Sequence, residues 1–136
     1  MKYIKRKQID EALAWEYRQY LTGHLSRKQC LPHIDDDLEI GISYYKEFTA
    51  DLPHVHPVAT EYAYVLSGSI RCLLLDGSGK EFQFNKGDFM LLPPGLGHAT
   101  KNKAGTKVLF IKAPGINDKT LLEPDEEVRK WLESWD

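Results

Sequence analysis

The chain has 136 residues, of which 42% are hydrophobic and 28% are charged, and its formal net charge is -2. These values fit one folded domain and give no overall basic field that would hold nucleic acid. No apolar run approaches the roughly 20 residues that span a bilayer, and Met1 to Gln8 lack the apolar segment of a secretory signal. We therefore expect a cytoplasmic protein with no nucleic-acid or membrane partner, in which Cys30 and Cys72 stay reduced.

Helical periodicity occurs only near the two ends of the chain. From about residue 9 to 21, apolar residues recur at intervals of three or four, acidic residues stand near the start and Gly23 follows the end. From about residue 124 to 135 the signal is clearer, because Pro124 suits the first helical position. One face of this segment carries an apolar stripe of Val128, Trp131, Leu132 and Trp135. The sequence therefore predicts one short helix at each end.

Between these helices the period changes to two. Apolar residues alternate with others from Leu38 to Tyr44, which predicts a half-buried strand. Further short strands, separated by turns such as Asp76–Gly79 and Pro93–Gly95, cover about residues 62–66, 70–75, 81–84, 88–92, 98–101 and 107–112. Many short strands at close spacing predict an all-β antiparallel sandwich or barrel. Its core spans about residues 38–112 of a single domain over residues 1–136.

Four side chains in this strand-rich region have the spacing of a metal site. His54 and His56 are two residues apart, so both imidazoles point to the same face of an extended strand. Glu61 begins the next strand, and His98 begins a later strand directly after a turn. Three imidazoles and one carboxylate suit a divalent transition ion (Mn, Fe, Co, Ni, Cu or Zn) better than calcium or magnesium, which prefer oxygen ligands. We therefore predict one such ion bound by these four residues.

Other interpretations of these residues stay open. Taken singly, a histidine or glutamate at a strand end is more often a surface or hydrogen-bonded residue than a ligand. A second and weaker metal cluster is offered by His24, Cys30 and His33, which no regular element is predicted to hold together.

The two motifs that contain the four residues resemble those of the cupin superfamily. They consist of His54, His56, Glu61 and Gly68, and of Gly87, Pro93, Gly95, His98 and Asn102. Every spacing matches, although Phe48 stands where a glycine usually precedes the first motif. The resemblance implies a double-stranded β-helix, or jelly-roll barrel, with the four ligands projecting inward near one mouth. It also implies that Gly68 and Gly87 adopt turn conformations that disfavour a Cβ atom, and that Asn102 caps a turn.

An ion with four protein ligands and six positions keeps two positions for a substrate that chelates it, or for a substrate oxygen and dioxygen. The leading hypothesis is a small isomerase or dioxygenase that acts on a sugar, a sugar acid or a hydroxy-keto compound. The alternatives are a stand-alone metal-anchored binding or sensory protein, and a structural barrel with a vestigial site. We expect Phe89 and Leu91 to line the cavity. The acid/base candidates are Tyr44 or Tyr45, Lys46, Tyr64 and Arg71.

The strand that follows Glu61 also predicts an exposed aromatic surface. If Glu61 faces inward, Tyr62 and Tyr64 face outward, and such a stripe needs a cover. The terminal helices or a second subunit can supply it. We expect a homodimer.

Overall fold

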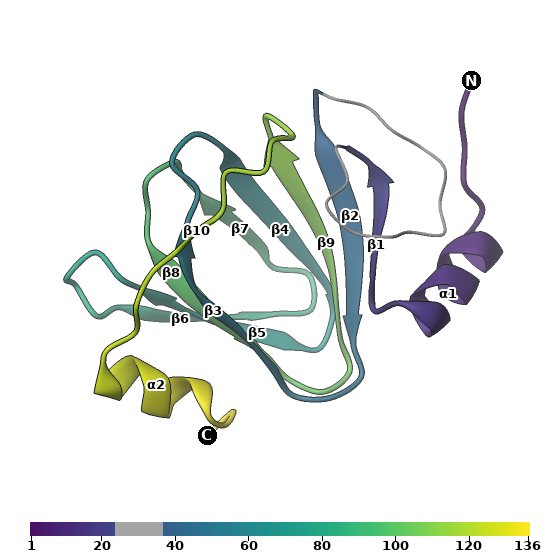
Figure 1. The fold of residues 1–136 in the computed structure, drawn as a ribbon. Coiled ribbons are helices and arrows are strands. Elements are labelled where there is room, and N and C mark those ends of the chain that lie inside the picture. The colour runs from purple at the N-terminus through teal and green to yellow at the C-terminus, as the bar shows by residue number, and fades with distance from the viewer. Residues whose placement is uncertain (24–36) are drawn as a thin grey trace.

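Two antiparallel sheets face each other in the computed structural model, which describes residues 1–23 and 37–136 (Figure 1). The first sheet has the order β1 (Arg18–Thr22), β2 (Glu39–Tyr45), β9 (Thr106–Ala113), β4 (Thr60–Ser67) and β7 (Phe89–Leu92). The second has the order β10 (Thr120–Leu121), β3 (Thr49–Val55), β8 (His98–Asn102), β5 (Ser69–Leu74) and β6 (Glu81–Asn85). In the described ranges the two sheets are not hydrogen-bonded into one closed barrel, and the architecture is that of a jelly roll.

The strands predicted between residues 38 and 112 are all present, with bounds that differ by one or two residues. The turn between β5 and β6 is held by Asp76, whose Oδ1 accepts a hydrogen bond of 2.9 Å from the Ser78 amide. Gly68 and Gly87 have φ angles of 75° and 92°, so the predicted need for glycine at these turns is confirmed. Among the described residues, the predicted strand ranges leave out β1, β10 and β3, although the segment around His54 was expected to be extended.

The N-terminal helix α1 (Arg6–Trp15) ends earlier than the periodicity predicts. A helix over residues 9–21 is wrong in its second half, because Arg18–Thr22 forms β1 and pairs antiparallel with β2. Pairing with a neighbouring strand satisfies the backbone groups of this segment and overrides a weak local helical preference. Arg18 therefore lies on a strand opposite Ser43 and not in a helix.

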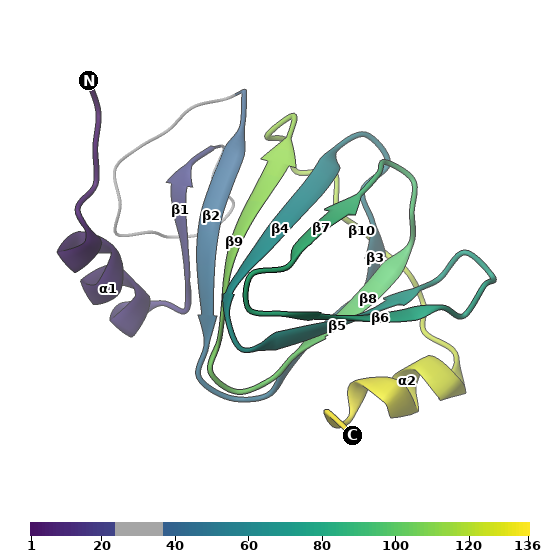
Figure 2. The same cartoon turned by 180° about the vertical axis from the view of Figure 1, so that it is seen from behind.

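The C-terminal helix α2 (Glu126–Leu132) is also shorter than predicted. Asp125 is its N-cap and accepts a hydrogen bond of 2.8 Å from the Val128 amide, so Pro124 stands before the cap and not at the first helical position. The buried Lys101 of β8 donates to the carbonyl oxygens of Trp131 and Ser134 and fixes this segment on the second sheet. The two helices therefore lie at opposite ends of the molecule (Figures 1 and 2). Neither is long and apolar enough to cross a membrane.

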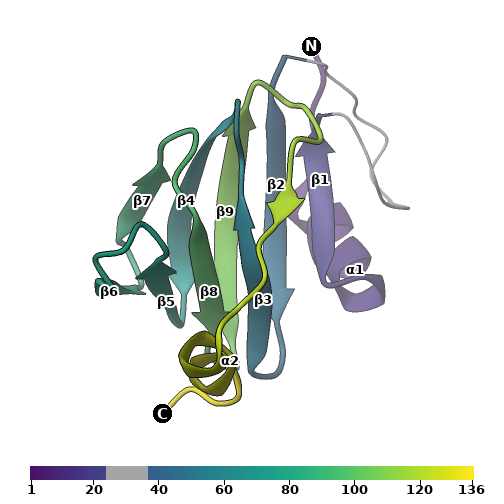
Figure 3. The same cartoon turned by 60° about the vertical axis from the view of Figure 1, so that its left-hand side comes forward.

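The core lies between the sheets, and strand pairing decides which side chains enter it (Figure 3). On β4, Ala63 is buried whereas Tyr64 is 42% exposed, so the predicted inward and outward faces of this strand are confirmed. On β7, Phe89 and Leu91 are 57% and 48% exposed, and the expectation that they line the cavity is wrong. Met90 pairs with Ala63, and directly paired residues share a face, so Met90 lines the cavity instead.

Candidate metal centre

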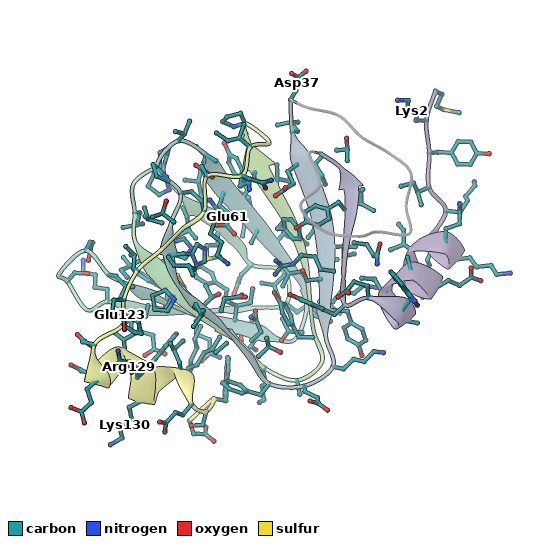
Figure 4. The ribbon with its side chains drawn as sticks, viewed as in Figure 1. Lys2, Asp37, Glu61, Glu123, Arg129 and Lys130 are labelled. Atoms are coloured by element: carbon teal, nitrogen blue, oxygen red, sulfur yellow. The ribbon has the colours of Figure 1, made fainter. Side chains whose placement is uncertain are left out.

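A cavity of about 200 Å³ lies between the sheets, and all four predicted ligands line it. His54 on β3 is directly paired with His98 on β8, and His56 follows immediately after β3. Glu61 projects from β4 of the facing sheet, and its side chain lies between the two sheets (Figure 4). The second motif also contacts the first through its backbone, because the Gly95 amide donates to the His56 carbonyl oxygen at 2.9 Å. The jelly roll thus brings three separate segments to one point.

The side-chain ends converge closely enough to share one ion. Single ligand atoms of His54, Glu61 and His98 all lie within 4.8 Å of one another. His56 is outside that group of three, but its Nε2 lies only 3.3 Å from Oε2 of Glu61. Nε2 of His98 lies 3.7 Å from the same oxygen. That these residues bind a metal stays a prediction at this point.

Each histidine has an acceptor on its other ring nitrogen. Nδ1 of His54 lies 2.7 Å from the Leu52 carbonyl oxygen, and Nδ1 of His98 lies 2.9 Å from the Leu96 carbonyl oxygen. Because a carbonyl oxygen can only accept, both Nδ1 atoms carry the hydrogen, and in the neutral rings both Nε2 atoms keep a free lone pair. The local pattern is the same at both sites, since each ring bonds the backbone two residues earlier in the chain.

In His56 a carboxylate, and not a backbone carbonyl, holds the hydrogen on Nδ1. Its Nδ1 lies 2.8 Å from Oδ1 of Asp118, in the segment that follows β9. Oδ2 of Asp118 accepts two backbone hydrogen bonds, from Val58 at 3.0 Å and from Ala59 at 2.8 Å. Burial opposes the charged form of Asp118, but these three hydrogen bonds outweigh burial and lower its pKa to about 2. Asp118 therefore stays an anion that holds the hydrogen of His56 on Nδ1.

The result is an excess of acceptors around Glu61. Its Oε2 is buried and has no hydrogen-bond partner among the described residues, an arrangement that is costly for a carboxylate unless a cation compensates it. The nearest ring nitrogens present lone pairs to it when the imidazoles are neutral. Three imidazole nitrogens and a carboxylate oxygen that face one another suit a divalent transition ion, so the donor set fits the predicted cofactor.

The pKa values of His54, His56 and Glu61 reflect how closely these groups face one another. Burial lowers the pKa of His54 to about 4, so this ring is neutral at physiological pH. Burial also opposes the charged form of His56, but its contacts with Glu61 and Asp118 outweigh burial and raise its pKa. Burial would raise the pKa of Glu61, yet the contact with His56 and the nearby His98 lower it to about 2. The contacts with Glu61 and Asp118 thus favour the protonated form of His56, whose positive charge would act on Glu61 as a cation does.

The other residues singled out from the sequence have mixed outcomes. Of the acid/base candidates, Tyr45 lines the cavity, whereas Tyr64 is exposed and Arg71 packs against the Trp135 ring at 4.7 Å. Tyr44 and Lys46 are not among the described residues that line the cavity. Asn102 donates to the Thr49 carbonyl oxygen at 3.4 Å and also lines the cavity. The alternative cluster of His24, Cys30 and His33 lies outside the described residues.

Sequence reasoning missed two residues of this region, Asp118 and Arg18. Asp118 stands in an irregular segment with no periodicity, and β10, which ties that segment to β3, has only two residues. Arg18 lies in the segment that was predicted as helix. A polar sequence directly after the last long strand was the only signal for Asp118.

The family model described as "Cupin domain" matches residues 45–112. Germin-like protein 11-1 of Oryza sativa subsp. japonica is 37% identical over 92 residues, which are 61% of this chain and 41% of that protein. This chain therefore spans less than half the length of that relative.

Among solved structures, an uncharacterized protein with a double-stranded β-helix domain from Klebsiella pneumoniae is 19% identical with a TM-score of 0.62, covering 91% of this chain and 100% of that one. Oxalate decarboxylase from Bacillus subtilis, described with Mn(II) centres, is 24% identical with a TM-score of 0.55, covering 70% of this chain and 28% of that one. The structural neighbours share the fold, and the family model spans half of the chain, so this protein belongs to the cupin family.

Proposed function

We propose that the protein is a cytoplasmic metal-dependent enzyme of the isomerase or dioxygenase type, which acts on a small oxygen-rich molecule such as a sugar, a sugar acid or a hydroxy-keto compound. The ion is a divalent first-row transition metal bound by His54, His56, Glu61 and His98. The observation that supports this most directly is the buried Oε2 of Glu61, which has no hydrogen-bond partner among the described residues and lies beside the Nε2 atoms of His56 and His98.

The surroundings of the four residues support a reactive site more than a purely structural one. A divalent ion bound there would supply Lewis-acid polarisation of a substrate oxygen. The cavity beside it holds groups that can orient a substrate, including Tyr45, Asp51 and Thr100. Burial, together with the charge of Asp51, raises the pKa of Tyr45 to about 12, so its hydroxyl stays protonated and can donate a hydrogen bond. The oxalate decarboxylase that shares this fold is named for an enzymatic reaction and for Mn(II) centres, which agrees with this proposal.

The first prediction concerns metal content and its dependence on pH. The purified protein should carry about one transition metal ion per chain, and replacing both His54 and His98 with alanine should abolish this. Affinity should fall as the pH falls through the raised pKa of His56, because a proton then competes for that ring. Elemental analysis of protein dialysed at a series of pH values measures both effects.

A double substitution of His24 and His33 by alanine is the matched control, because it tests the alternative cluster. Full metal content after loss of His54 and His98, or occupancy that is constant down to about pH 4, would contradict histidine ligation at this site.

The second prediction separates an open site from a closed structural one. An ion with four protein ligands keeps room for a chelator, so oxalate should bind the Co(II)- or Mn(II)-loaded protein much more tightly than acetate does. A change in the absorption or EPR spectrum of the metal during titration reports this directly. If the spectrum ignores every bidentate oxygen ligand, the metal is structural and the enzyme proposal fails. Tight binding without any turnover of sugars or hydroxy-keto compounds would instead support the alternative, a binding protein.

The third prediction concerns Asp118 as the residue that positions His56. Replacing it with alanine should weaken metal binding by about 10- to 100-fold, because the ring loses the acceptor that fixes its tautomer. Asp118→Asn keeps an acceptor oxygen without the charge. Its metal affinity should lie between that of Asp118→Ala and that of the wild type. Competition with a chromophoric chelator measures the affinity, and ¹⁵N NMR of the zinc form reports the tautomer of His56.

Asp76→Ala is the control for the Asp118 variants, since Asp76 also accepts a backbone hydrogen bond but stands in the remote turn between β5 and β6. Equal metal affinity in Asp118→Ala and the wild type would show that this carboxylate has no role at the site.

The proposal includes a homodimer, formed through an outer apolar stripe that we define as Tyr62, Tyr64, Phe89 and Leu91. These residues are direct neighbours across β4 and β7, and Tyr64, Phe89 and Leu91 are each more than 40% exposed. Both described helices pack elsewhere: Ala12 of α1 contacts Gln19 of β1, and α2 lies on the second sheet. Burying such a stripe at about 25 cal/mol per Å² favours association, which must exceed the entropy lost on binding.

The fourth prediction is a mass of twice 15.6 kDa by light scattering coupled to size exclusion at micromolar concentration. Phe89→Lys should give monomers, because it places a charge in the middle of the stripe. Phe82→Lys is the matched control, since Phe82 is 45% exposed on β6 of the other sheet and should leave the mass unchanged. A wild-type monomer would refute the dimer.

A further inference from the structure

Arg18 brings a fixed positive charge into the cavity from β1, outside the segment that matches the cupin family model. Its Nε donates to Ser43 Oγ at 3.0 Å, and its Nη2 donates to the Tyr45 hydroxyl at 3.0 Å. Among the described residues these two hydrogen bonds use two of the five N–H groups of the guanidinium. Within residues 1–23 and 37–136 no side-chain hydrogen bond uses the other three N–H groups, so they can donate to a ligand in the cavity.

Two aromatic rings fix the orientation of this guanidinium. Its Cζ lies 5.4 Å from the centroid of the Tyr17 ring and 5.3 Å from that of the Phe110 ring. The Phe110 ring occupies the space that a side chain at position 41 would need, since a Cβ built on Gly41 would lie 2.1 Å from its Cζ. An arginine held by two hydrogen bonds and two rings is a pre-organised planar donor, which suits a carboxylate.

The register of the first sheet sets Arg18 apart from the candidate metal centre. Arg18 pairs with Ser43, Ser43 with Val108, and Val108 with Val65. Glu61 stands four residues before Val65 on β4, roughly 13 Å along the strand, and three strand-to-strand steps of about 4.8 Å separate β1 from β4. Arg18 and Glu61 thus line different parts of one cavity, and the long arginine side chain shortens the gap between them.

The charges around the cavity favour an anionic ligand once the metal is bound. Among the described residues that line it, the basic ones are Arg18, Lys112 and Lys119, and the acidic ones are Glu39, Asp51 and Glu61. Glu39 and Lys112 form a buried ion pair at 3.3 Å. The charges that line the cavity therefore cancel, and a divalent ion together with the Asp118 anion beside His56 leaves an excess of about one positive charge, which favours an anionic ligand.

Asp51 is the acidic residue whose charge acts on Arg18 in the cavity. Its carboxylate accepts a hydrogen bond of 3.2 Å from Thr100 Oγ1. Burial opposes the charge of Arg18, but Tyr45 and, after it, Asp51 outweigh burial and keep the pKa of Arg18 above its ordinary value. The negative charge of Asp51 therefore attracts the Arg18 guanidinium, and it also repels an anion that binds next to it.

We infer that Arg18, with Tyr45, forms a carboxylate subsite in the cavity apart from Glu61, so that the ligand is a small hydroxy acid or keto acid with a second carboxylate. This inference rests on the proposed function, because the first end of the ligand chelates the metal. The second end is recognised by the guanidinium of Arg18.

Two pairs of probes test the subsite on the Mn(II)-loaded protein by calorimetry. Each pair has one carbon chain with and without the distal carboxylate: 2-hydroxyglutarate with 2-hydroxypentanoate, and 2-hydroxyadipate with 2-hydroxyhexanoate. In at least one pair the dicarboxylate should bind about tenfold more tightly or better, as expected for a charge-assisted hydrogen bond. Arg18→Met should reduce this preference to within about twofold. Arg18→Lys should retain part of the preference.

Arg71→Met is the matched control, because Arg71 packs on Trp135 and is not among the described residues that line the cavity. Asp51→Asn should strengthen dicarboxylate binding by removing a like charge. If it weakens that binding, Asp51 accepts a hydrogen bond from a hydroxyl group there, and the carboxylate assignment is overturned. The same preference in Arg18→Met and the wild type, or no preference at either chain length, also overturns it.

Metal content separates the two proposals. A wild-type protein that takes up no metal refutes the proposed function before any probe is added. A metal-loaded protein without preference for the dicarboxylates refutes the Arg18 subsite alone. If Arg18→Met loses its cooperative thermal unfolding, the comparison of Arg18→Lys and Asp51→Asn with the wild type decides the question.

Discussion

The candidate site depends on where three hydrogens are placed. The Nδ1 atoms of His54 and His98 face backbone carbonyls, and that of His56 faces the carboxylate of Asp118. None of these partners can donate, so the neutral rings have unprotonated Nε2 atoms, and those of His56 and His98 lie next to Glu61. Lone pairs and a carboxylate directed at one another are repulsive in a buried space. A cation relieves this repulsion, and the polarity of the site therefore follows from hydrogen bonds that lie outside it.

The register of the strands determines which side chains lie around Glu61 and the histidines. Lys112 of β9 is paired with Glu61 of β4 on one side and with Glu39 of β2 on the other, so in the register this lysine stands between two acidic residues. Its ion pair with Glu39 at 3.3 Å leaves Glu61 to the histidines. A shift of one residue in either pairing would turn these side chains to the outer face. The same register places the aromatic residues of β4 outside, next to those of β7.

The sequence predicted the strands between residues 38 and 112 because their alternation is local, and it predicted the inward face of β4 from Glu61 alone. The prediction failed for segments whose conformation or inward face depends on the strand with which they pair. The phase of β7 follows from the pairing of Met90 with Ala63, which no pattern within β7 reveals. The apolar spacing near residues 17–21 fits a helix, but pairing with β2 made this segment a strand. That error concealed Arg18, and the irregular segment after β9 concealed Asp118.

Arg18 and Asp118 both lie outside the segment that matches the family model, whereas the four predicted ligands lie within it. The shared segment accordingly supplies the donor set, and the flanking segments supply a carboxylate that orients one ligand and an arginine that faces the cavity. Such a division lets one fold serve different reactions, because the flanking segments can change without disturbing the ligand geometry. In this chain the flanking segments reach the cavity through pairings with β2 and β3, so the groups that lie beside the donor set depend on how these segments return to the sheets.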